Sequence, residues 1–379
     1  MRRSSMYRPT GSLSLALVVL LIPALGRIAA GAAETLEIGQ TAPDFCLPGV
    51  DGKEHCLKDF ADAPILAVVF TCNHCPTAQA YEGRIKQLAE DYRDKGVAVV
   101  AISPNDPKAL RLDELGYTDV SDSLEDMKAR AKNEAFNFPY LYDGDDQKVS
   151  RAYGPEATPH VFVFDADRKL RYVGRIDNSA KVESATSHDA RTAIDALLTA
   201  KPVPVEKTKT FGCSIKWSDK RPSVEEALKR WDEEEVALER IDAPGVEALV
   251  KNDSEKLRLI NVWATSCGPC LEEFPELVAM HRSYRRREFE LVTISSDPVE
   301  QEKQALSLLE EEHASSKNYL FVGANEYELA EALDKQWQGA LPHTLLVAPG
   351  GKILYRHQGA LDPLEVKRAI VGYLGRVYK

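Results

Sequence analysis

The sequence predicts an α/β fold that is built twice, as two tandem domains, each with a central mixed β-sheet flanked by helices. Three observations predict this fold. The 379 residues suit two domains of roughly 100–200 residues each. In each half, short apolar runs typical of buried strands alternate with segments of helical periodicity. The same order of elements, including a Cys-x-x-Cys motif, also occurs once in each half.

The first unit begins with a buried strand that leads into a Cys-x-x-Cys motif. The apolar run at 65–70 predicts the strand, and Cys72 and Cys75 follow it directly. Apolar and aromatic residues at helical spacing come next and predict an amphipathic helix. A second strand is predicted at 97–102.

The second unit repeats this order. A buried strand is predicted at 257–263, and Cys267 and Cys270 follow it. An amphipathic helix then leads to a strand at 289–294.

In each unit a helix is expected after the second strand, and the unit ends with a Pro-His pair, two strands and a helix. Pro159 and His160 in the first unit correspond to Pro342 and His343 in the second, at one offset (342 − 159 = 183). The closing strands are predicted at 161–164, 169–172, 344–347 and 352–355, and the closing helices at 188–199 and 363–374.

With this order of elements in both halves, the sequence resembles the thioredoxin superfamily. The segments 70–76, 137–143 and 212–217 of the first half resemble its peroxiredoxin-like branch, the redoxin and AhpC/TSA proteins. The second half resembles the TlpA/ResA branch through residues 261–270, followed by Glu273. We expect domains at 33–222 and 223–379, with an acidic helix over 224–241 opening the second.

The resemblance also implies a role for the two loops at the Pro-His pairs. It implies that Pro159 and Pro342 are cis and face the cysteines, which makes Thr158, Pro159, Leu341 and Pro342 the substrate-binding residues. A protein substrate would lie extended beside either loop and pair with its backbone.

The charge and the cysteine content exclude two classes of protein. The formal net charge is −11, whereas a nucleic-acid-binding domain usually has a basic face. Seven cysteines in 379 residues are too few for a small disulfide scaffold. We therefore expect no nucleic acid among the partners.

The N-terminus has the features of a secretory signal. Arg2 and Arg3 precede an apolar run over 13–25, and small residues follow at 29–33. The run is shorter than the ~20 residues that span a bilayer. We expect a signal peptide at 1–32 and a mature chain that is secreted into the periplasm without a stable membrane span. An uncleaved N-terminal anchor is the alternative.

The positions of the cysteines predict two redox centres. Only a thiolate attacks a disulfide, and a helix N-terminus favours the anion. We therefore expect Cys72 and Cys267 to be nucleophiles and Cys75 and Cys270 to resolve the mixed disulfides. The redox-active disulfides would carry the electrons, without a bound cofactor or metal. A structural disulfide or half of a zinc site is the alternative at each motif.

Two further side chains are candidates for tuning these centres. His74 can place an imidazolium beside the Cys72 thiolate and make the first centre the more oxidising one. The acid that thioredoxin-like proteins often bury six residues before the first cysteine is replaced by Leu66 and Asn261. Glu273 matches the TlpA/ResA acid and is our candidate proton acceptor for Cys270; an exposed helix residue is the alternative.

The other cysteines and the two histidines have different expected roles. Cys46 and Cys56 flank the turn signal Asp51-Gly52 and would face each other across a hairpin, which suits a structural disulfide. Cys213 is either a free buried thiol or a third redox thiol that reaches the first centre. His160 and His343 either lie near the sulfurs or are strand residues of the sheet.

We expect a thiol-disulfide oxidoreductase that acts on cysteine-containing proteins and is recharged by a membrane thiol reductase. A thiol peroxidase is one alternative, although the peroxidase pattern would need Thr and Pro where Val69 and Ile65 stand. A copper-binding module resembling the Sco proteins, with Cys72, Cys75 and His160 as ligands, is the other.

Overall fold

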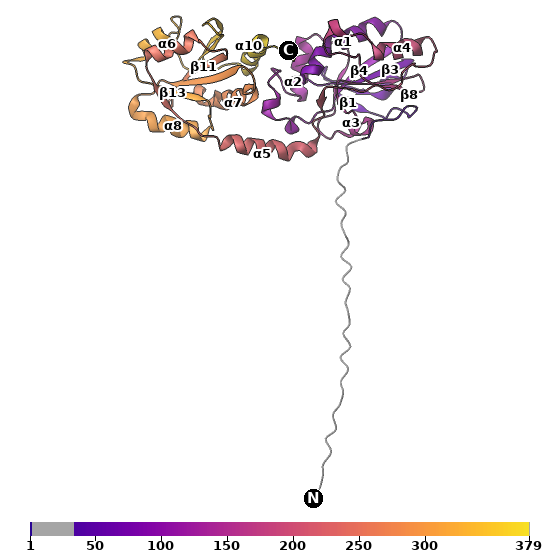
Figure 1. Ribbon diagram of the computed structural model, residues 1–379, viewed down its shortest axis with the longest axis horizontal. Helices are drawn as coiled ribbons and strands as arrows, with labels where there is room; N and C mark the ends of the chain where they lie inside the picture. The colour runs from indigo at the N-terminus through magenta and orange to yellow at the C-terminus, as the bar shows by residue number, and fades with distance from the viewer. Residues whose placement is uncertain (2–33, 379) are drawn as a thin grey trace. The chain divides into compact units, whose positions relative to one another are not determined.

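The computed structural model describes Met1 and residues 34–378. Except for Met1, the predicted signal peptide at 1–32 lies outside these residues. Two separate α/β sheets follow one another along the chain, each covered by helices (Figure 1). This is the tandem thioredoxin-like architecture that the sequence predicts.

The first sheet has five strands in the order β5-β4-β3-β7-β8. Strand β3 pairs in parallel with β4 and antiparallel with β7. The elements of this domain are β1 (Cys46–Pro48), β2 (Glu54–Cys56), β3 (Ile65–Phe70), α1 (Pro76–Arg93), β4 (Val97–Ser103), α2 (Leu124–Asn133), β5 (Tyr140–Tyr142), α3 (Lys148–Tyr153), β6 (Ala157–Thr158), β7 (His160–Phe164), β8 (Leu170–Gly174), α4 (Asp189–Leu198) and β9 (Cys213–Ser214).

The second sheet has six strands in the order β10-β13-β12-β11-β14-β15. Strand β11 holds the place of β3, because it pairs in parallel with β12 and antiparallel with β14. The elements of this domain are α5 (Arg221–Asp232), β10 (Glu239–Ile241), α6 (Ala243–Lys251), β11 (Leu257–Trp263), α7 (Gly268–Tyr284), β12 (Phe289–Ser295), α8 (Glu302–Glu311), β13 (Lys317–Phe321), α9 (Glu326–Leu333), β14 (His343–Val347), β15 (Ile353–Gln358) and α10 (Pro363–Leu374).

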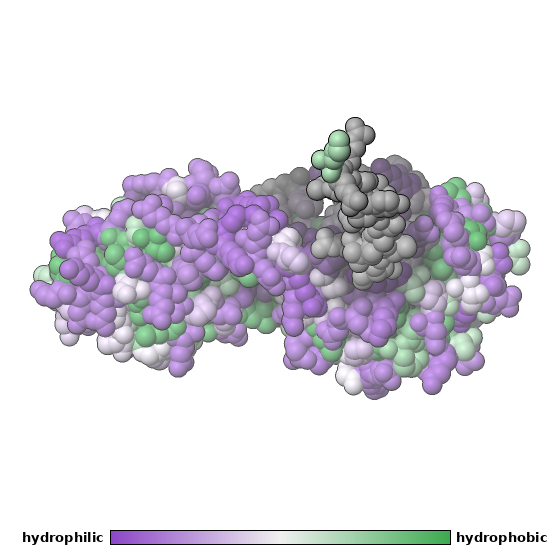
Figure 2. Space-filling model, turned by 90° about the horizontal axis from the view of Figure 1, so that it is seen from below, coloured by the Kyte–Doolittle hydropathy of each residue, from purple (hydrophilic) through white to green (hydrophobic). Residues whose placement is uncertain are grey.

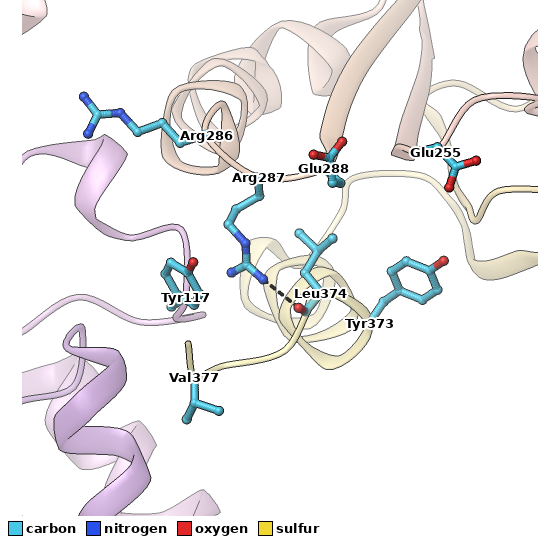
Figure 3. A pocket seen from close by; sticks show the side chains of 8 residues that line it. All are labelled: Tyr117, Glu255, Arg286, Arg287, Glu288, Tyr373, Leu374 and Val377. Atoms are coloured by element: carbon cyan, nitrogen blue, oxygen red, sulfur yellow. Dashed lines mark hydrogen bonds between the residues drawn. The ribbon is translucent and has the colours of Figure 1, made fainter. Parts of the chain in front are cut away.

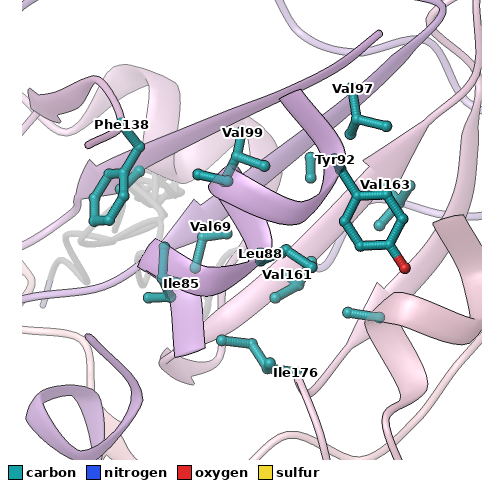
Figure 4. Close-up of a cluster of buried hydrophobic side chains, with 14 of the residues drawn as sticks. Val69, Ile85, Leu88, Tyr92, Val97, Val99, Phe138, Val161, Val163 and Ile176 are labelled. Carbon is teal, nitrogen blue, oxygen red and sulfur yellow. The ribbon is translucent and has the colours of Figure 1, made fainter. Parts of the chain in front are cut away.

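Strand β3 shows why its apolar run forms the centre of a two-faced core. Successive side chains of a strand point to opposite faces. Ile65, Ala67 and Val69 pack on one face against α1 and α4, in the cluster of Figure 4. The alternate residues from Leu66 to Phe70 pack on the other face against α3. All six side chains are buried, so a run without polar alternation is what this position requires.

Two expectations about the elements need correction. The helix expected over 224–241 ends at Asp232, and residues 239–241 form β10 instead. They do so because β10 adds in parallel to the edge of the sheet at β13. The second correction is that each unit has more elements between its second strand and its proline than the single helix that the repeat predicted. The additional elements are β5, α3 and β6 in the first unit, and β13 and α9 in the second.

The surface is largely hydrophilic on the face drawn in Figure 2, where apolar residues form small separate patches. Within residues 34–378, no helix combines the length and the apolar character that a membrane span requires.

Candidate redox centres

The first Cys-x-x-Cys motif lies between the end of β3 and the start of α1. Helix α1 begins at Pro76, and its N-cap is Cys75, whose Sγ accepts a hydrogen bond from Ala78 N at 3.4 Å. The expectation that Cys72 occupies the helix N-terminus is therefore wrong in this geometry. The thiol that gains from the helix amides and dipole is Cys75.

Asp122 is the reason that α1 begins after the motif. The backbone amides of Asn73 and His74 both donate to Asp122 Oδ1, at 2.9 and 3.1 Å. The carboxylate thus holds the motif in a turn and leaves the helix to start at Pro76.

His74 and Asp122 form a buried pair beside the thiols. His74 Nδ1 lies 2.5 Å from Asp122 Oδ2, and Asn105 Nδ2 donates to the same oxygen at 2.8 Å. Burial alone would lower the pKa of His74, but the charge and the hydrogen bond of Asp122 raise it above its usual value. The pKa of Asp122 is lowered: burial opposes this, and the charge and hydrogen bonds of His74 outweigh burial. Below the raised pKa of His74, the pair is an imidazolium and a carboxylate.

The two thiols of this centre differ in their affinity for a proton. Burial would raise the pKa of Cys75, but hydrogen bonds from Cys213 and Cys72 and the positive charge of His74 bring it well below the usual value. Burial, the Cys75 thiolate and the Asp122 charge raise the pKa of Cys72. A ring nitrogen of His74 lies within 4.8 Å of Cys72 Sγ, as we expected. Its positive charge also lowers the pKa of Cys75.

The loop at Pro159 closes over both thiols. The Thr158–Pro159 peptide bond is cis. Thr158 Oγ1 lies 3.1 Å from Cys72 Sγ, and the Thr158 carbonyl oxygen lies 3.4 Å from Cys75 Sγ, which can donate to it as a thiol. The structure thus brings Thr158 and Pro159 together with the cysteines of the first motif.

The second motif lies at the start of α7. Cys267 is the N-cap and its Sγ accepts a hydrogen bond from Cys270 N at 3.3 Å. The two cysteines form a disulfide, in which Cys267 is partly exposed and Cys270 is fully buried. Leu341 packs in the same apolar cluster as both cysteines, and the bond from Leu341 to Pro342 is cis. A partner thiol can therefore reach Cys267 but not Cys270.

Glu273 is a buried side chain behind the second disulfide. It is 6% exposed, so the alternative of a solvent-exposed helix residue is excluded. Its carboxylate accepts hydrogen bonds from Asn261 Nδ2 at 2.8 Å and from Leu361 N at 3.0 Å. Burial raises the pKa of Glu273 despite these bonds. Since residues three apart share a helix face, Glu273 lies on the side of α7 that carries Cys270.

His160 and His343 are strand residues packed inside their domains. Burial lowers the pKa of His160 to about 4, and its Nδ1 accepts a hydrogen bond from Glu156 N. His343 stacks on Trp337 with ring centroids 5.1 Å apart, and its Nε2 lies 3.2 Å from Asp334 Oδ2. The copper alternative requires His160 near the thiols. Among the described residues, however, the cluster of potential ligands at Cys72 contains His74 and Asp122 instead.

Cys46 and Cys56 are joined by a disulfide. They face each other in the register of the antiparallel β1–β2 hairpin, as their placement around Asp51-Gly52 suggests.

A cavity of about 450 Å³ lies around Arg287 (Figure 3) and shares Tyr117 and Arg287 with a second cavity, which Cys213 lines. The lining of the first of these cavities contains no cysteine or histidine. Arg287 Nη2 donates to the Leu374 carbonyl at 2.6 Å, so this guanidinium binds backbone. We therefore assign the redox chemistry to the two motifs and not to this cavity.

Comparison with known families now identifies both halves. Residues 38–173 match the AhpC/TSA family, and residues 235–370 match the Redoxin family. The chain carries two thioredoxin-like domains of the redoxin type. The AhpC/TSA domain contains the first centre, and the Redoxin domain contains the second.

Several relatives are named for redox activity. The thiol-disulfide oxidoreductase ResA of Geobacillus thermodenitrificans is 26% identical over 138 residues, which are 36% of this chain and 68% of that protein. A putative peroxiredoxin bcp of Helicobacter pylori is 26% identical over 121 residues, 31% of this chain and 80% of that protein. The chain is an oxidoreductase of the thiol-disulfide family.

The comparison with solved structures finds proteins that each match about half of this chain. A hypothetical protein from Sinorhizobium meliloti is 35% identical, with 49% of this chain and 97% of that chain covered and a TM-score of 0.43. A putative thiol:disulfide interchange protein DsbE from Chlorobium tepidum is 20% identical, with 44% and 98% covered and a TM-score of 0.33.

Sequence reasoning missed two side chains of the first centre, Asp122 and Asn105. They lie 48 and 31 residues from His74 (122 − 74 and 105 − 74) in irregular segments, and no local pattern marks either one. Asp122 precedes Ser123, the N-cap of α2, so a helix-start signal was present but did not point to His74.

Proposed function

We propose that the chain exchanges disulfides with cysteine-containing proteins through Cys267 and Cys270 of the Redoxin domain. The observation that carries this proposal is the pairing of a partly exposed N-cap cysteine with a buried cysteine. Such a site lets a partner sulfur reach Cys267, while Cys270 stays positioned to attack only Cys267.

The exchange would proceed in two steps. In the reduced site, the Cys267 thiolate attacks one sulfur of the partner disulfide, and the other partner sulfur leaves as a thiolate. Cys270 then gives its proton to Glu273 and attacks Cys267 Sγ, which releases the partner as a dithiol. The partner gains two electrons, and the Cys267–Cys270 disulfide forms.

The loop at Leu341 is our candidate for holding the partner chain. None of the strand pairs within residues 34–378 includes Leu341, so its backbone can accept an added strand. The carbonyl of the preceding Ala340 already accepts a hydrogen bond from Trp337 Nε1 at 2.8 Å. Main-chain pairing at this edge would set the partner disulfide beside Cys267.

The proposal implies a donor and a compartment. Each turnover leaves a disulfide that needs two electrons, and we propose a membrane thiol reductase as their source. We also propose export to the periplasm through the signal at 1–32. N-terminal sequencing of the exported protein should then begin at Ala33, and a sequence that begins at Met1 would contradict cleavage.

An insulin-reduction assay on the full chain tests the function. With dithiothreitol as the electron donor, we expect Cys267→Ser to lose at least 90% of the activity above the uncatalysed rate, because its nucleophile is gone. Ser266→Ala is the matched control, since Ser266 is an exposed neighbour without a redox group. Full activity in Cys267→Ser would overturn the proposal, and the same assay on Cys72→Ser measures the share of the first centre.

A thiol peroxidase is the second candidate, and one contact favours it. Although Val69 stands where the peroxidase pattern needs threonine, the Thr158 hydroxyl reaches Cys72 Sγ from another loop. Peroxide consumption with dithiothreitol that disappears in Cys72→Ser and persists in Cys267→Ser would establish this activity. Equal rates in wild type and Cys72→Ser would exclude it.

A further inference from the structure

The chain itself fills the peptide-binding edge of the first centre. Strand β9 pairs antiparallel with β6, and the register sets Cys213 opposite Thr158 and Ser214 opposite Ala157. This is the edge on which a protein substrate was expected to add as a strand. A partner chain cannot pair there while β9 is in place, because each backbone edge accepts one neighbour.

Thr210 and Gly212, which precede Cys213, fit the β9 segment to the loop at Pro159. Thr210 Oγ1 donates to the Pro159 carbonyl at 2.9 Å. Gly212 has φ +144°, and a Cβ atom at this position would lie 2.0 Å from the Thr158 carbonyl oxygen. Only glycine combines this conformation with so close an approach. The segment is therefore shaped to carry a cysteine to Thr158.

Thr158 brings the three sulfur atoms of this domain together. Its side chain contacts Cys72, its carbonyl contacts Cys75, and its strand partner is Cys213. Cys213 also packs directly against the apolar cluster that Cys72 and Cys75 form. The arrangement is that of a substrate cysteine presented to a redox pair, except that this cysteine belongs to the same chain.

Only one of the three sulfurs faces the outside. Cys72 and Cys75 are 2% and 0% exposed, whereas Cys213 is partly exposed. Cys213 lines a cavity of about 290 Å³ together with His74 and Lys216, and neither Cys72 nor Cys75 is part of its lining. A thiol or disulfide that enters this cavity meets Cys213 first.

We propose that Cys213 is the exchange thiol of the first centre, which passes a disulfide between the buried pair and an outside thiol through a Cys75–Cys213 bond. This deepens the proposed function and rests on redox activity at Cys72 and Cys75. The outside partner is a dithiol that presents a sulfur to the cavity without pairing its backbone at β6.

The exchange begins inside the domain. Cys213, as a thiolate, attacks Cys75 Sγ of the Cys72–Cys75 disulfide. The Cys75–Cys213 bond forms and the Cys72–Cys75 bond breaks. Cys72 leaves and takes the proton that Cys213 lost. No electrons are gained or lost in this isomerisation. A thiolate of the outside dithiol attacks Cys213, Cys75 leaves as a thiolate beside His74, and the second outside thiol releases Cys213. The dithiol loses two electrons and two protons, and the centre becomes fully reduced.

Disulfide mapping of the full chain tests the proposal. Trypsin separates Cys72 and Cys75, in the peptide 59–84, from Cys213, in the peptide 210–216. In Cys72→Ser treated with diamide, we expect mass spectrometry to find these peptides joined through Cys75 and Cys213. In Cys75→Ser treated with oxidised glutathione, we expect the adduct on Cys213 at least tenfold more often than on Cys72.

Kinetics provide an independent readout. In Cys213→Ser, the Cys72–Cys75 disulfide should still form, but its reduction by glutathione should be at least tenfold slower than in wild type. Ser214→Ala is the matched control on β9 and should react as wild type does. Formation of Cys72–Cys75 in wild type without any Cys75–Cys213 bond in Cys72→Ser would overturn this inference alone. Failure of Cys72–Cys75 to form in wild type would overturn the first redox centre as well.

Discussion

His74 has the largest electrostatic role at the first centre, because its charge lies between an acid and a thiolate. Asp122 keeps the buried imidazole protonated, and the imidazolium in turn favours the Cys75 thiolate. A stabilised thiolate stabilises the reduced form and makes the disulfide a stronger oxidant. We therefore expect His74 and Asp122 to set the redox potential of the first centre.

Replacing His74 tests this chain of charges. In His74→Gln the imidazolium is lost, so the negative charge of the Asp122 carboxylate is no longer compensated. Both effects disfavour a nearby anion. We expect the pKa of the Cys75 thiol to rise by at least about one unit, which corresponds to about 1.4 kcal/mol. Thiolate absorbance near 240 nm, followed as a function of pH in the reduced Cys267→Ser/Cys270→Ser chain, measures it. The exposed His188 supplies the control, His188→Gln, and an unchanged titration in His74→Gln would exclude the role.

Glu273 is the corresponding residue of the second centre. As a carboxylate with a raised pKa it can accept a proton near neutral pH, and it loses this ability as the pH falls through its pKa. We expect Glu273→Gln to slow the reduction of insulin about tenfold or more at pH 7. We also expect it to remove the acidic limb of the pH–rate profile. Glu272→Gln, an exposed change on the same helix, should leave rate and profile as they are; a parallel loss in both variants would refute a specific role.

At the scale of elements, the two centres differ in where a helix starts. Helix α7 begins directly after Cys267, whereas α1 begins after Cys75. Gly268 and Pro269 suit the first helical turn, but Asn73 and His74 give their amides to Asp122. The two motifs have the same spacing, but the N-cap is the first cysteine, Cys267, in the second domain and the second cysteine, Cys75, in the first domain.

The β9 segment allows an element-scale prediction. Gly212→Ala should push β9 away from Thr158, because the new methyl group would lie 2.0 Å from a carbonyl oxygen. We expect a loss of about 1–3 kcal/mol in the free energy of unfolding, together with faster alkylation of Cys75. Urea unfolding and timed alkylation measure both effects.

Gly39→Ala is the control for the backbone strain alone. Gly39 also has a positive φ, +84°, but nothing lies within 4 Å of an added Cβ. If Gly212→Ala costs no more than Gly39→Ala and leaves the alkylation of Cys75 unchanged, β9 does not cover the thiols.

At the scale of the whole molecule, two centres with different surroundings lie on one chain. The first has an imidazolium beside its thiolate, whereas Gly268 and Pro269 bring no charge to the second. We propose that electrons flow from Cys267 and Cys270 to Cys72 and Cys75.

The two potentials test this direction. We expect the first centre to be more oxidising by tens of millivolts, where about 30 mV corresponds to about 1.4 kcal/mol. The difference should shrink as the pH rises through the raised pKa of His74, because the imidazolium then loses its charge. Redox titration of the full chains Cys267→Ser/Cys270→Ser and Cys72→Ser/Cys75→Ser measures each centre alone. A lower potential at Cys72 and Cys75 would reverse the direction.

The strands and most helices follow from local patterns. The strand at 257–263 and the helix at 363–374 have the expected bounds, because a continuous apolar run and an apolar helix stripe each report burial on their own. Short edge elements such as β10 escape such patterns, since an edge strand depends on its neighbour for its hydrogen bonds. The sequence also left open whether Glu273 is exposed. Only its hydrogen bonds with Asn261 and Leu361, which are distant in the sequence, show that it is buried.

The sequence by itself determined that two thioredoxin-like units follow one another, because repeated strands, Cys-x-x-Cys motifs and prolines are contiguous signals. Only the tertiary structure decided which sulfur of the first centre is favoured as a thiolate, and which one faces the outside. Those properties depend on Asp122 and Cys213, which lie 50 and 141 residues from Cys72 (122 − 72 and 213 − 72). Charge and accessibility act through space, and no spacing along the chain records them.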